Sequence, residues 1–253
     1  MQKVLESTSE ITESIEGLSR EKFSSISASL PFSAKVNLPT KSFTEEIWIN
    51  LTSPLKHQLK SEAVVDFNES SLIESVNTLR WDGFGWWSSN VDGSGVARVA
   101  QYFGIEISQG AVLGIIGGGG AARSTAHTWQ QLGGKVKIFG GKRDLGDFDW
   151  LKLTELNDRV CDFFVNFDDD IVPDDIEVTG FVLNSKYHNV SGEHEDRVAV
   201  VTGEVIDGRW LLAAQHLENW SQLWAPQHAD LLPPLDLLIS MLIVAESTLA
   251  SYS

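Results

Sequence analysis

One stretch of the chain, AVLGIIGGGGAARSTAHTWQQLGGKVKIF (residues 111–139), restricts the possible fold more than any other. Residues 111–116 form an apolar run that ends in four glycines, which is the pattern of a buried strand entering a tight turn. Residues 121–132 have helical composition, and residues 135–139 have that of a second strand. A strand, a glycine-rich turn, a helix and another strand in this order make the first half of a dinucleotide-binding fold. The sequence therefore predicts an α/β protein.

The glycine-rich turn predicts a phosphate-binding site. Glycines let the backbone approach a pyrophosphate closely, and the N-terminus of the following helix supplies free N–H groups and partial positive charge. A glycine-rich loop without a ligand is the alternative interpretation. The residues assigned to cofactor binding here and after the second strand are Gly117, Gly118, Gly119, Gly120, Ala121, Arg123, Lys142 and Arg143.

The residues after the second strand indicate which dinucleotide binds. An NAD-binding protein usually carries Asp or Glu at this point to bind the ribose hydroxyl groups. This chain has Lys142 and Arg143 instead, and two cations suit the 2′-phosphate of NADP. NADP is therefore the predicted cofactor, and two solvated charges in a surface loop are the alternative.

The remaining pattern predicts two lobes. Asp82-Gly83 lies between two apolar runs and has the composition of a tight hairpin turn. Helical patterns cover residues 93–104, 209–224 and 233–253, and further strand candidates cover residues 161–167, 178–185 and 197–206. We expect an N-terminal α/β substrate domain and a Rossmann NADP-binding domain. The predicted bounds are 1–98 for a substrate-binding and catalytic domain completed by C-terminal helices in 209–253, and 99–208 for the Rossmann domain.

Composition limits the partners and the compartment. The 253 residues carry a formal net charge of −16, so the surface would repel nucleic acid and anionic membranes. The start of the chain does not have the pattern of a signal peptide, and the apolar stretch LLISMLIVA is too short to span a membrane. Cys161 is the single cysteine, and we expect it to be buried in a strand. The histidines and the acidic stretch FDDDIVPDD lack metal-site spacing, so no metal is predicted. Because neither a signal peptide nor a membrane span is predicted, a cytoplasmic protein is expected.

Four short motifs resemble those of the shikimate dehydrogenase family. NLTSPLK, VNTL, NVDGSG and GGGGAAR are similar, in order and spacing, to the family's Asn-Val-Thr-x-Pro-x-Lys, Asn-Thr, Asn-Thr-Asp-Gly and Gly-Ala-Gly-Gly-Ala-Ala-Arg. The segment DGRWLLAAQHLENWSQLW resembles the family's C-terminal Asp-Gly-x-x-Met-Leu-x-x-Gln. The resemblance thus extends over nearly the whole chain.

The resemblance implies an activity: the reversible NADPH-dependent reduction of 3-dehydroshikimate to shikimate in aromatic amino-acid (chorismate) biosynthesis, by a monomer or homodimer. Lys56 would be the catalytic lysine and Asp92 its acidic partner. Reducing a ketone builds negative charge on the carbonyl oxygen, and an ammonium group held beside a carboxylate can stabilise that charge and supply a proton.

The resemblance also implies a substrate site. Thr52, Asn77 and Gln215 would bind the substrate's hydroxyl groups, and Tyr187 would lie near the substrate. The family's Ser-x-Ser-Pro motif has its counterpart in STSE, which gives a pair of carboxylate ligands, and SASLP offers an alternative pair. These pairs are Ser7 with Ser9, and Ser27 with Ser29.

Two motifs depart from the family pattern. The family's Asn-Ala-Thr-Pro becomes NFDD, and its Asn-Arg-Thr becomes GGKR. Two alternative functions therefore stay open: a quinate/shikimate dehydrogenase paralogue with an altered substrate, and a non-catalytic nucleotide-binding relative.

Overall fold

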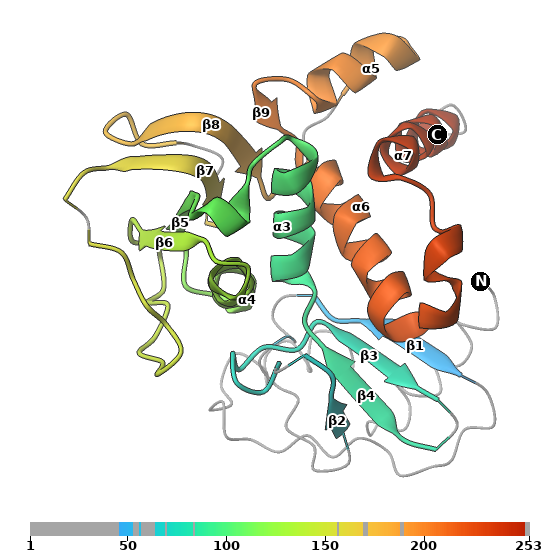
Figure 1. The fold of residues 1–253 in the computed structure, drawn as a ribbon. Coiled ribbons are helices and arrows are strands. Elements are labelled where there is room, and N and C mark those ends of the chain that lie inside the picture. Colours follow the sequence, from blue (N-terminus) through green and yellow to red (C-terminus); the bar gives the residue numbers. More distant parts are fainter. Residues whose placement is uncertain are drawn as a thin grey trace. The chain divides into compact units, whose positions relative to one another are not determined.

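The computed structural model describes residues 46–52, 56, 64–68, 70–82, 84–155, 157–168, 172–187 and 190–250. The chain divides into two compact units, Met1–Asn90 and Val91–Ser253, and each unit contains its own β-sheet (Figure 1). The domain bounds expected from the sequence, which join the C-terminal helices to the N-terminal lobe, stay a prediction.

The first unit holds a mixed sheet of four strands in the order β1-β3-β4-β2. The strands are β1 (Ile47–Asn50), β2 (Val64–Asp66), β3 (Thr78–Trp81) and β4 (Trp86–Ser89). β3 pairs antiparallel with β1 and with β4, whereas β2 pairs parallel with β4. The hairpin predicted around Asp82 is therefore confirmed.

The Asp82 side chain explains why the chain turns between β3 and β4. Its Oδ1 accepts the N–H groups of Phe84 and Gly85 at 2.9 and 2.8 Å, and its Oδ2 accepts the Trp87 indole N–H at 2.7 Å. An aspartate that binds the backbone two and three residues ahead fixes a turn without needing a long loop.

The second unit is built on a parallel sheet of five strands in the order β6-β5-β7-β8-β9. The strands are β5 (Val112–Ile116), β6 (Lys135–Ile138), β7 (Val160–Asn166), β8 (Glu177–Asn184) and β9 (Val205–Ile206). Phe163 and Val165 contribute to the large core on one face, while Phe164 packs on the other face with Cys161 and Ile176. A parallel sheet buried on both faces confirms the predicted α/β class with a Rossmann-like lobe.

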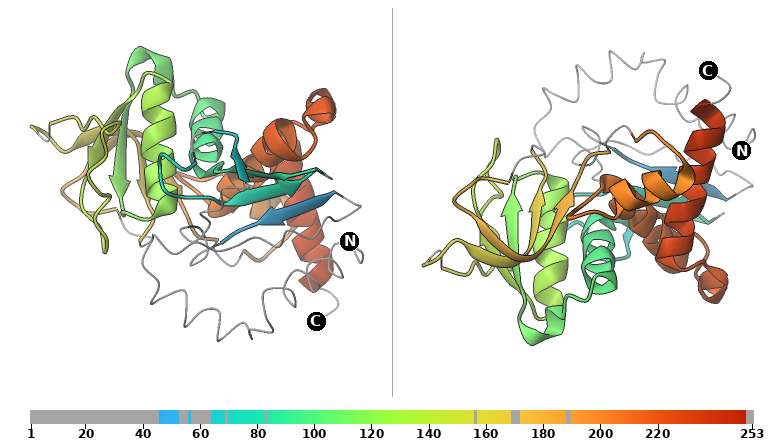
Figure 2. Two further views of the ribbon diagram at one scale, coloured as in Figure 1. Left: turned by 90° about the horizontal axis from the view of Figure 1, so that it is seen from below. Right: turned by 90° about the horizontal axis from the view of Figure 1, so that it is seen from above.

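Three helices of this unit lie side by side, with α3 between α4 and α6 (Figures 1 and 2). The helices are α3 (Asp92–Tyr102), α4 (Gly120–Gln131), α5 (His194–Val201), α6 (Gly208–Asn219) and α7 (Leu235–Ala250), and irregular turns at Trp220–Trp224 and Pro226–Leu231 join the last two. None of the described helices combines the length and the hydrophobicity that a membrane span requires.

One predicted strand is wrong over most of its length. Residues 197–206 were expected to be extended, but residues 197–201 belong to helix α5 and only Val205–Ile206 forms a strand. Glu195 and Asp196 lie in the first turn of α5, where negative charge stabilises a helix N-terminus. The helix also buries Val201 completely, so local charge and packing outweigh the strand preference of the valines.

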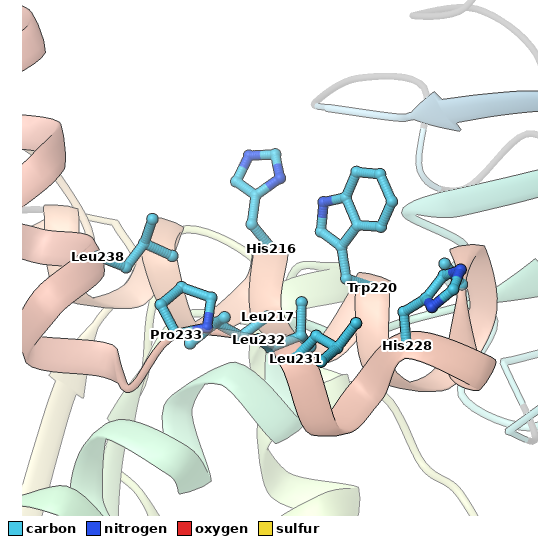
Figure 3. Close-up of a pocket in the computed structure, with 9 residues that line it drawn as sticks. His216, Leu217, Trp220, His228, Leu231, Leu232, Pro233 and Leu238 are labelled. Carbon is cyan, nitrogen blue, oxygen red and sulfur yellow. The ribbon is translucent and has the colours of Figure 1, made fainter.

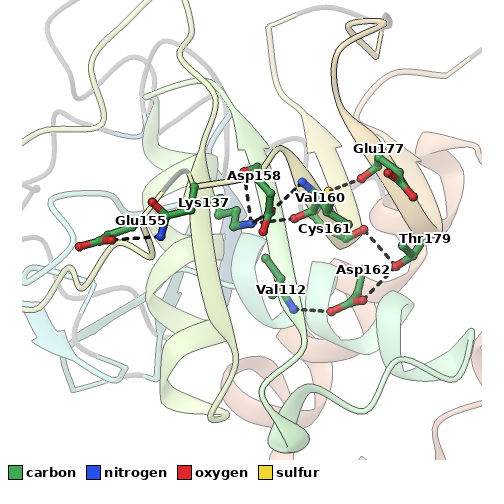
Figure 4. Close-up of polar contacts among 10 residues, drawn as sticks. Val112, Lys137, Glu155, Asp158, Val160, Cys161, Asp162, Glu177 and Thr179 are labelled. Atoms are coloured by element: carbon green, nitrogen blue, oxygen red, sulfur yellow. Dashed lines mark hydrogen bonds and ion pairs between the residues drawn. The ribbon is translucent and has the colours of Figure 1, made fainter.

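Polar side chains link strands of the parallel sheet, both across β5 and between β5 and β7 (Figure 4). The Lys137 ammonium donates to the Val160 carbonyl oxygen at 3.0 Å and pairs with Asp158. The Asp162 carboxylate accepts the Val112 N–H at 2.7 Å. Cys161 is buried as expected, and burial raises the pKa of its thiol to about 12, so the thiol is protonated near pH 7.

Candidate functional site

The glycine-rich turn joins β5 to α4 and leaves a row of N–H groups open. Gly117 leaves the strand with φ +124, a conformation that glycine adopts readily, and its N–H donates to the Gly140 carbonyl oxygen at 2.9 Å. Gly119 is the N-cap of α4 and has no side chain to cap it. Among the described residues, no acceptor is found for the N–H groups of residues 118–121. Such a helix N-terminus is suited to bind phosphate.

The loop after β6, residues 140–145, packs directly against this turn. A Cβ atom on Gly118 would lie 2.3 Å from the Arg143 carbonyl oxygen and 2.4 Å from the Asp144 carbonyl carbon, so only glycine fits here. The Arg123 Nε donates to the Leu145 carbonyl oxygen at 2.9 Å, and its guanidinium carbon lies 4.9 Å from the centre of the Phe148 ring. Arg123, predicted as a phosphate ligand, therefore holds the 140–145 loop.

The two predicted cations of the loop have different surroundings. The Arg143 Nη1 lies 3.9 Å from the position of a Cβ on Gly119, so this guanidinium is at the open N–H groups. The Lys142 Nζ instead donates to the Asp168 carbonyl oxygen at 3.0 Å, and the Lys142 N–H donates to the Asp168 carboxylate.

Sequence reasoning did not assign a role to Asp168. This residue follows the carboxyl end of β7, and its N–H donates to the Asn166 Oδ1 at 3.0 Å. β5 lies between β6 and β7 in the sheet, so the contact between Lys142 and Asp168 crosses the end of β5. The available signal was the departure NFDD, in which an acid lies two residues after the end of a buried strand, at the edge of the sheet where α/β proteins bind ligands.

The structure brings together two predicted residues that lie 123 positions apart. Gln215 Nε2 donates to Asp92 Oδ1 at 2.7 Å. Asp92 begins helix α3 and is only 1% exposed, while Gln215 projects from α6, which packs along α3. A buried carboxylate at a helix N-terminus, where the dipole favours its negative charge, is thus oriented by an amide from the neighbouring helix.

Ser124, which sequence reasoning also missed, joins α4 to the start of α3. The N–H of Gly93, the residue after Asp92, donates to Ser124 Oγ at 2.9 Å. The two helices are in close contact here, because a Cβ on Gly93 would lie 2.2 Å from the Ser124 carbonyl oxygen. The helix that begins at the glycine-rich turn is therefore hydrogen-bonded to the residue beside Asp92.

Three predicted residues of the first unit surround the start of β3. Asn77 is 5% exposed, and its Oδ1 accepts the Thr78 hydroxyl at 3.0 Å. The carbonyl oxygen of Lys56 accepts the Val76 N–H at 2.8 Å, which ties Lys56 to the same place. Thr52 is exposed and follows Leu51, whose N–H donates to the Asn77 carbonyl oxygen at 2.6 Å.

The remaining predicted contacts stay predictions. Lys56 belongs to the first unit and Asp92 to the second, so their pairing is an expectation from the sequence. Tyr187 is 58% exposed after β8, and no partner of its hydroxyl group is found in the described part of the chain. The predicted carboxylate ligands and their alternatives lie outside the described residues: Ser7, Ser9, Ser27 and Ser29.

The second unit also contains an apolar pocket of about 500 Å³ beside α6 (Figure 3). His216 and Trp220 project from α6 and its continuation, and Leu231, Leu232 and Leu238 complete the apolar lining. Burial lowers the pKa of His216, so its imidazole is neutral near pH 7. Over the described residues, no group of His, Cys, Asp or Glu side chains is arranged to hold a metal ion.

The parallel sheet and the glycine-rich turn define the class of the second unit, a Rossmann-like fold. No protein-family model matches the chain. The shikimate dehydrogenase (NADP(+)) of Methylibium petroleiphilum is 38% identical over 74 residues, which are 29% of this chain and 25% of that protein. The shikimate dehydrogenase (NADP(+)) of Methanococcoides burtonii is 36% identical over 91 residues, which are 36% of this chain and 32% of that protein.

Solved structures show the same fold over more of the chain. The shikimate 5-dehydrogenase of Thermus thermophilus, determined in complex with NADP(H) and shikimate, has a TM-score of 0.57 at 18% identity and covers 78% of each chain. The chain is thus similar in sequence to shikimate dehydrogenases over these short ranges and has the same fold as the Thermus enzyme over most of its length. The curated matches span a third or less of those relatives' length.

Proposed function

We propose that this protein is an NADP-dependent oxidoreductase that acts on a CH–OH group, interconverting 3-dehydroshikimate and shikimate. The observation that carries the proposal is the hydrogen bond between Gln215 and Asp92. The resemblance assigns these two residues separately, one to substrate binding and one to proton handling. Their direct contact inside one unit supports a common site.

The proposed chemistry divides between the cofactor and the chain. NADPH supplies the hydride that reduces the carbonyl carbon. Lys56 stabilises the negative charge that builds on the carbonyl oxygen and donates the proton to it, and Asp92 keeps the lysine charged and oriented. Gln215 holds the Asp92 carboxylate in place and binds a substrate hydroxyl group with its remaining hydrogen-bonding atoms. Thr52 and Asn77 bind further hydroxyl groups.

Cofactor binding is proposed at the glycine-rich turn. The open N–H groups of residues 118–121 bind the pyrophosphate. Arg143 lies at this turn and is the cation best placed to bind a phosphate group, whereas Lys142 is engaged by Asp168. The relatives named as NADP-dependent enzymes support NADP as the cofactor.

The initial rate of nicotinamide absorbance change tests the proposal. Shikimate and quinate are each assayed with NADP⁺ and with NAD⁺, using the parent protein and Lys56→Ala. We expect turnover with shikimate and NADP⁺ that falls at least about 100-fold in Lys56→Ala, because a positioned proton donor contributes about 10²–10⁴-fold.

The other outcomes separate the alternatives. Faster turnover of quinate would identify a paralogue with a different substrate. No turnover of either compound by folded protein, together with tight NADP⁺ binding, would identify a nucleotide-binding relative that lacks the reaction. Equal rates for Lys56→Ala and the parent protein would remove Lys56 from the mechanism.

A further inference from the structure

We infer that Asp168 is a positioning residue for cofactor binding: it fastens the 140–145 loop across the end of β5 and thereby holds Arg143 at the open N–H groups of the glycine-rich turn. This inference rests on the proposed function only in taking a dinucleotide as the ligand. Asp168 itself touches no phosphate.

The loop is fastened at its start by Asp168. The carboxylate accepts the Lys142 N–H, and the Asp168 carbonyl oxygen accepts the Lys142 ammonium at 3.0 Å. One residue therefore binds both ends of Lys142, and neither interaction uses Arg143. Asp168 is itself held by Asn166, whose Oδ1 accepts its N–H at 3.0 Å, so the anchor is fixed to the end of β7.

The carboxylate lies against two glycines, and a side chain on Gly141 would overlap it. A Cβ on Gly141 would lie 2.9 Å from Asp168 Oδ2, and one on Gly117 would lie 3.5 Å from Oδ1. Both glycines have positive φ, +151 and +124. Residues from the ends of β5, β6 and β7 thus meet around one carboxylate.

The middle of the loop is fastened by Gly118. A Cβ at this position would overlap the carbonyl groups of Arg143 and Asp144, at 2.3 and 2.4 Å. Gly118 is not among the glycines with positive φ, so its backbone would accept alanine and the only obstacle is this contact. Gly118 stands where the motif that this stretch resembles has alanine. The absence of a side chain lets the loop backbone close on the turn.

The result is a preorganised cation. Arg143 is exposed, and a free arginine side chain loses rotamer entropy when it binds a phosphate. Fixing the backbone on both sides of Arg143 keeps its guanidinium, with Nη1 3.9 Å from the Cβ position of Gly119, beside the open N–H groups. Preorganisation of this kind raises affinity without adding a contact.

Calorimetric titration of NADP⁺ into the intact protein, without substrate, tests the inference. We expect Asp168→Ala to weaken binding about tenfold and Asp168→Asn to weaken it less, because asparagine keeps an acceptor for the Lys142 N–H. Gly118→Ala should weaken binding by a similar factor from the other side of the loop. Asp147→Ala removes an exposed acid near the same loop and should leave the affinity unchanged.

A double-mutant cycle separates positioning from general damage. In an Arg143→Gln background, where the cation is already gone, Asp168→Ala should have no further effect on NADP⁺ affinity. ADP and adenosine 2′,5′-bisphosphate, titrated separately, then show whether Arg143 binds the pyrophosphate or the 2′-phosphate, since the variants will weaken one probe more than the other.

Three results would overturn the inference: unchanged affinity in Asp168→Ala, an increased affinity, which would make the fastened loop an obstacle to the cofactor, or equal effects of Asp168→Ala with and without Arg143. These differ from failure of the proposed function. A protein that binds NADP⁺ with the expected variant effects and turns over no shikimate would keep the inference and lose the reaction. A parent protein that binds no NADP⁺ would overturn both.

Discussion

Asp92 is the residue on which the proposed chemistry depends most. Its carboxylate is 1% exposed at the first position of α3, and the structure gives it a specific partner in Gln215 at 2.7 Å. Burying a carboxylate is costly unless hydrogen bonds compensate. Burying Asp92 therefore costs folding free energy that an exposed acid of the same chain does not cost. Such a cost is expected for a functional group.

Under the proposed function, Asp92→Asn should lower kcat about 100-fold or more, because it removes the carboxylate assigned to proton handling, and should leave NADP⁺ affinity within about twofold. Steady-state kinetics with shikimate and titration of NADP⁺ measure the two quantities. Asp230→Asn, an exposed acid of the same unit, is the matched control. A kcat within twofold of the parent value would contradict the assignment of Asp92.

Ser124 links helix α4 to the residue beside Asp92. Ser124→Ala removes the acceptor of the buried Gly93 N–H, and an unsatisfied buried donor costs about 1–3 kcal/mol of unfolding free energy. We also expect kcat to fall more than the affinity for NADP⁺, since the start of α3 loses its fixed position. Chemical denaturation and steady-state kinetics test these two effects.

Ser94→Ala is the matched control for Ser124→Ala. The Ser94 hydroxyl donates to the Val91 carbonyl oxygen, which also accepts the Gly95 N–H at 2.9 Å. Its removal leaves no buried group unpaired, so we expect a loss below about 1 kcal/mol. Equal effects of both serine variants would show that the bond to Gly93 has no special role.

At the scale of elements, an ion-pair cluster joins the start of α6 to α7. The Arg209 guanidinium donates to Asp207 at 2.9 Å and to both oxygens of Glu246 at 2.9 and 3.1 Å. Asp207 also caps α6 by accepting the Arg209 N–H at 2.9 Å. Burial by itself would lower the pKa of Arg209, but the bonds to these two carboxylates raise it. The cluster fixes the direction in which α6 carries Gln215 toward Asp92.

Arg209→Met should lower the free energy of unfolding by about 3 kcal/mol, because it removes the guanidinium that balances the charge of the buried Asp207 carboxylate. Glu246→Gln should cost less than about 1 kcal/mol, since the Glu246 side chain is 40% exposed. Urea denaturation of the two variants beside the parent protein measures the difference. A smaller loss for Arg209→Met than for Glu246→Gln would contradict this view of the cluster.

His216 makes the free energy of unfolding depend on pH. Burial lowers its pKa below the ordinary value of 6.5, so between these two pKa values the unfolded chain binds more protons than the folded protein. The stabilisation from a neutral His216 is therefore present above about pH 6.5 and is lost as pH falls from 6.5 through the lowered pKa.

His216→Gln should remove this part of the pH dependence. We expect the parent protein to lose more unfolding free energy than His216→Gln between pH 7 and pH 5.5, measured by urea denaturation at each pH. His228 is exposed and serves as the control. His228→Gln should show the same pH dependence as the parent protein. Parallel pH profiles for all three proteins would contradict the lowered pKa of His216.

At the scale of the whole molecule, sequence patterns predicted regular elements better than they predicted contacts. β5, the glycine-rich turn, α4 and β6 follow from a single stretch, because the period of the apolar residues changes where the secondary structure changes. Residues 197–201 were wrongly predicted to be extended, because the acidic first turn and the buried Val201 of α5 outweigh the preference of valine for strands. Such competition between local preference and packing cannot be resolved from one segment alone.

The candidate site could be predicted only where a motif names its residues. The bond between Asp92 and Gln215 joins positions that the resemblance had already identified. The roles of Ser124 and Asp168 could not be predicted, because they depend on which strand ends and helix starts meet in space. The role of Gly118 could not be predicted either. The glycine-rich stretch around it indicated a turn, but the need for glycine at this position comes from the loop that packs against it.

The proposed reaction is hydride transfer between NADPH and the carbonyl carbon of 3-dehydroshikimate. The most direct test is the mass of the product after incubation with 3-dehydroshikimate and NADPH that carries deuterium on one face of nicotinamide C4. We expect NADPH labelled on one of the two faces, and not on the other, to yield shikimate heavier by one deuterium, and Lys56→Ala to yield almost none in the same time. Folded protein that yields no deuterated shikimate from either labelled cofactor would contradict the proposal.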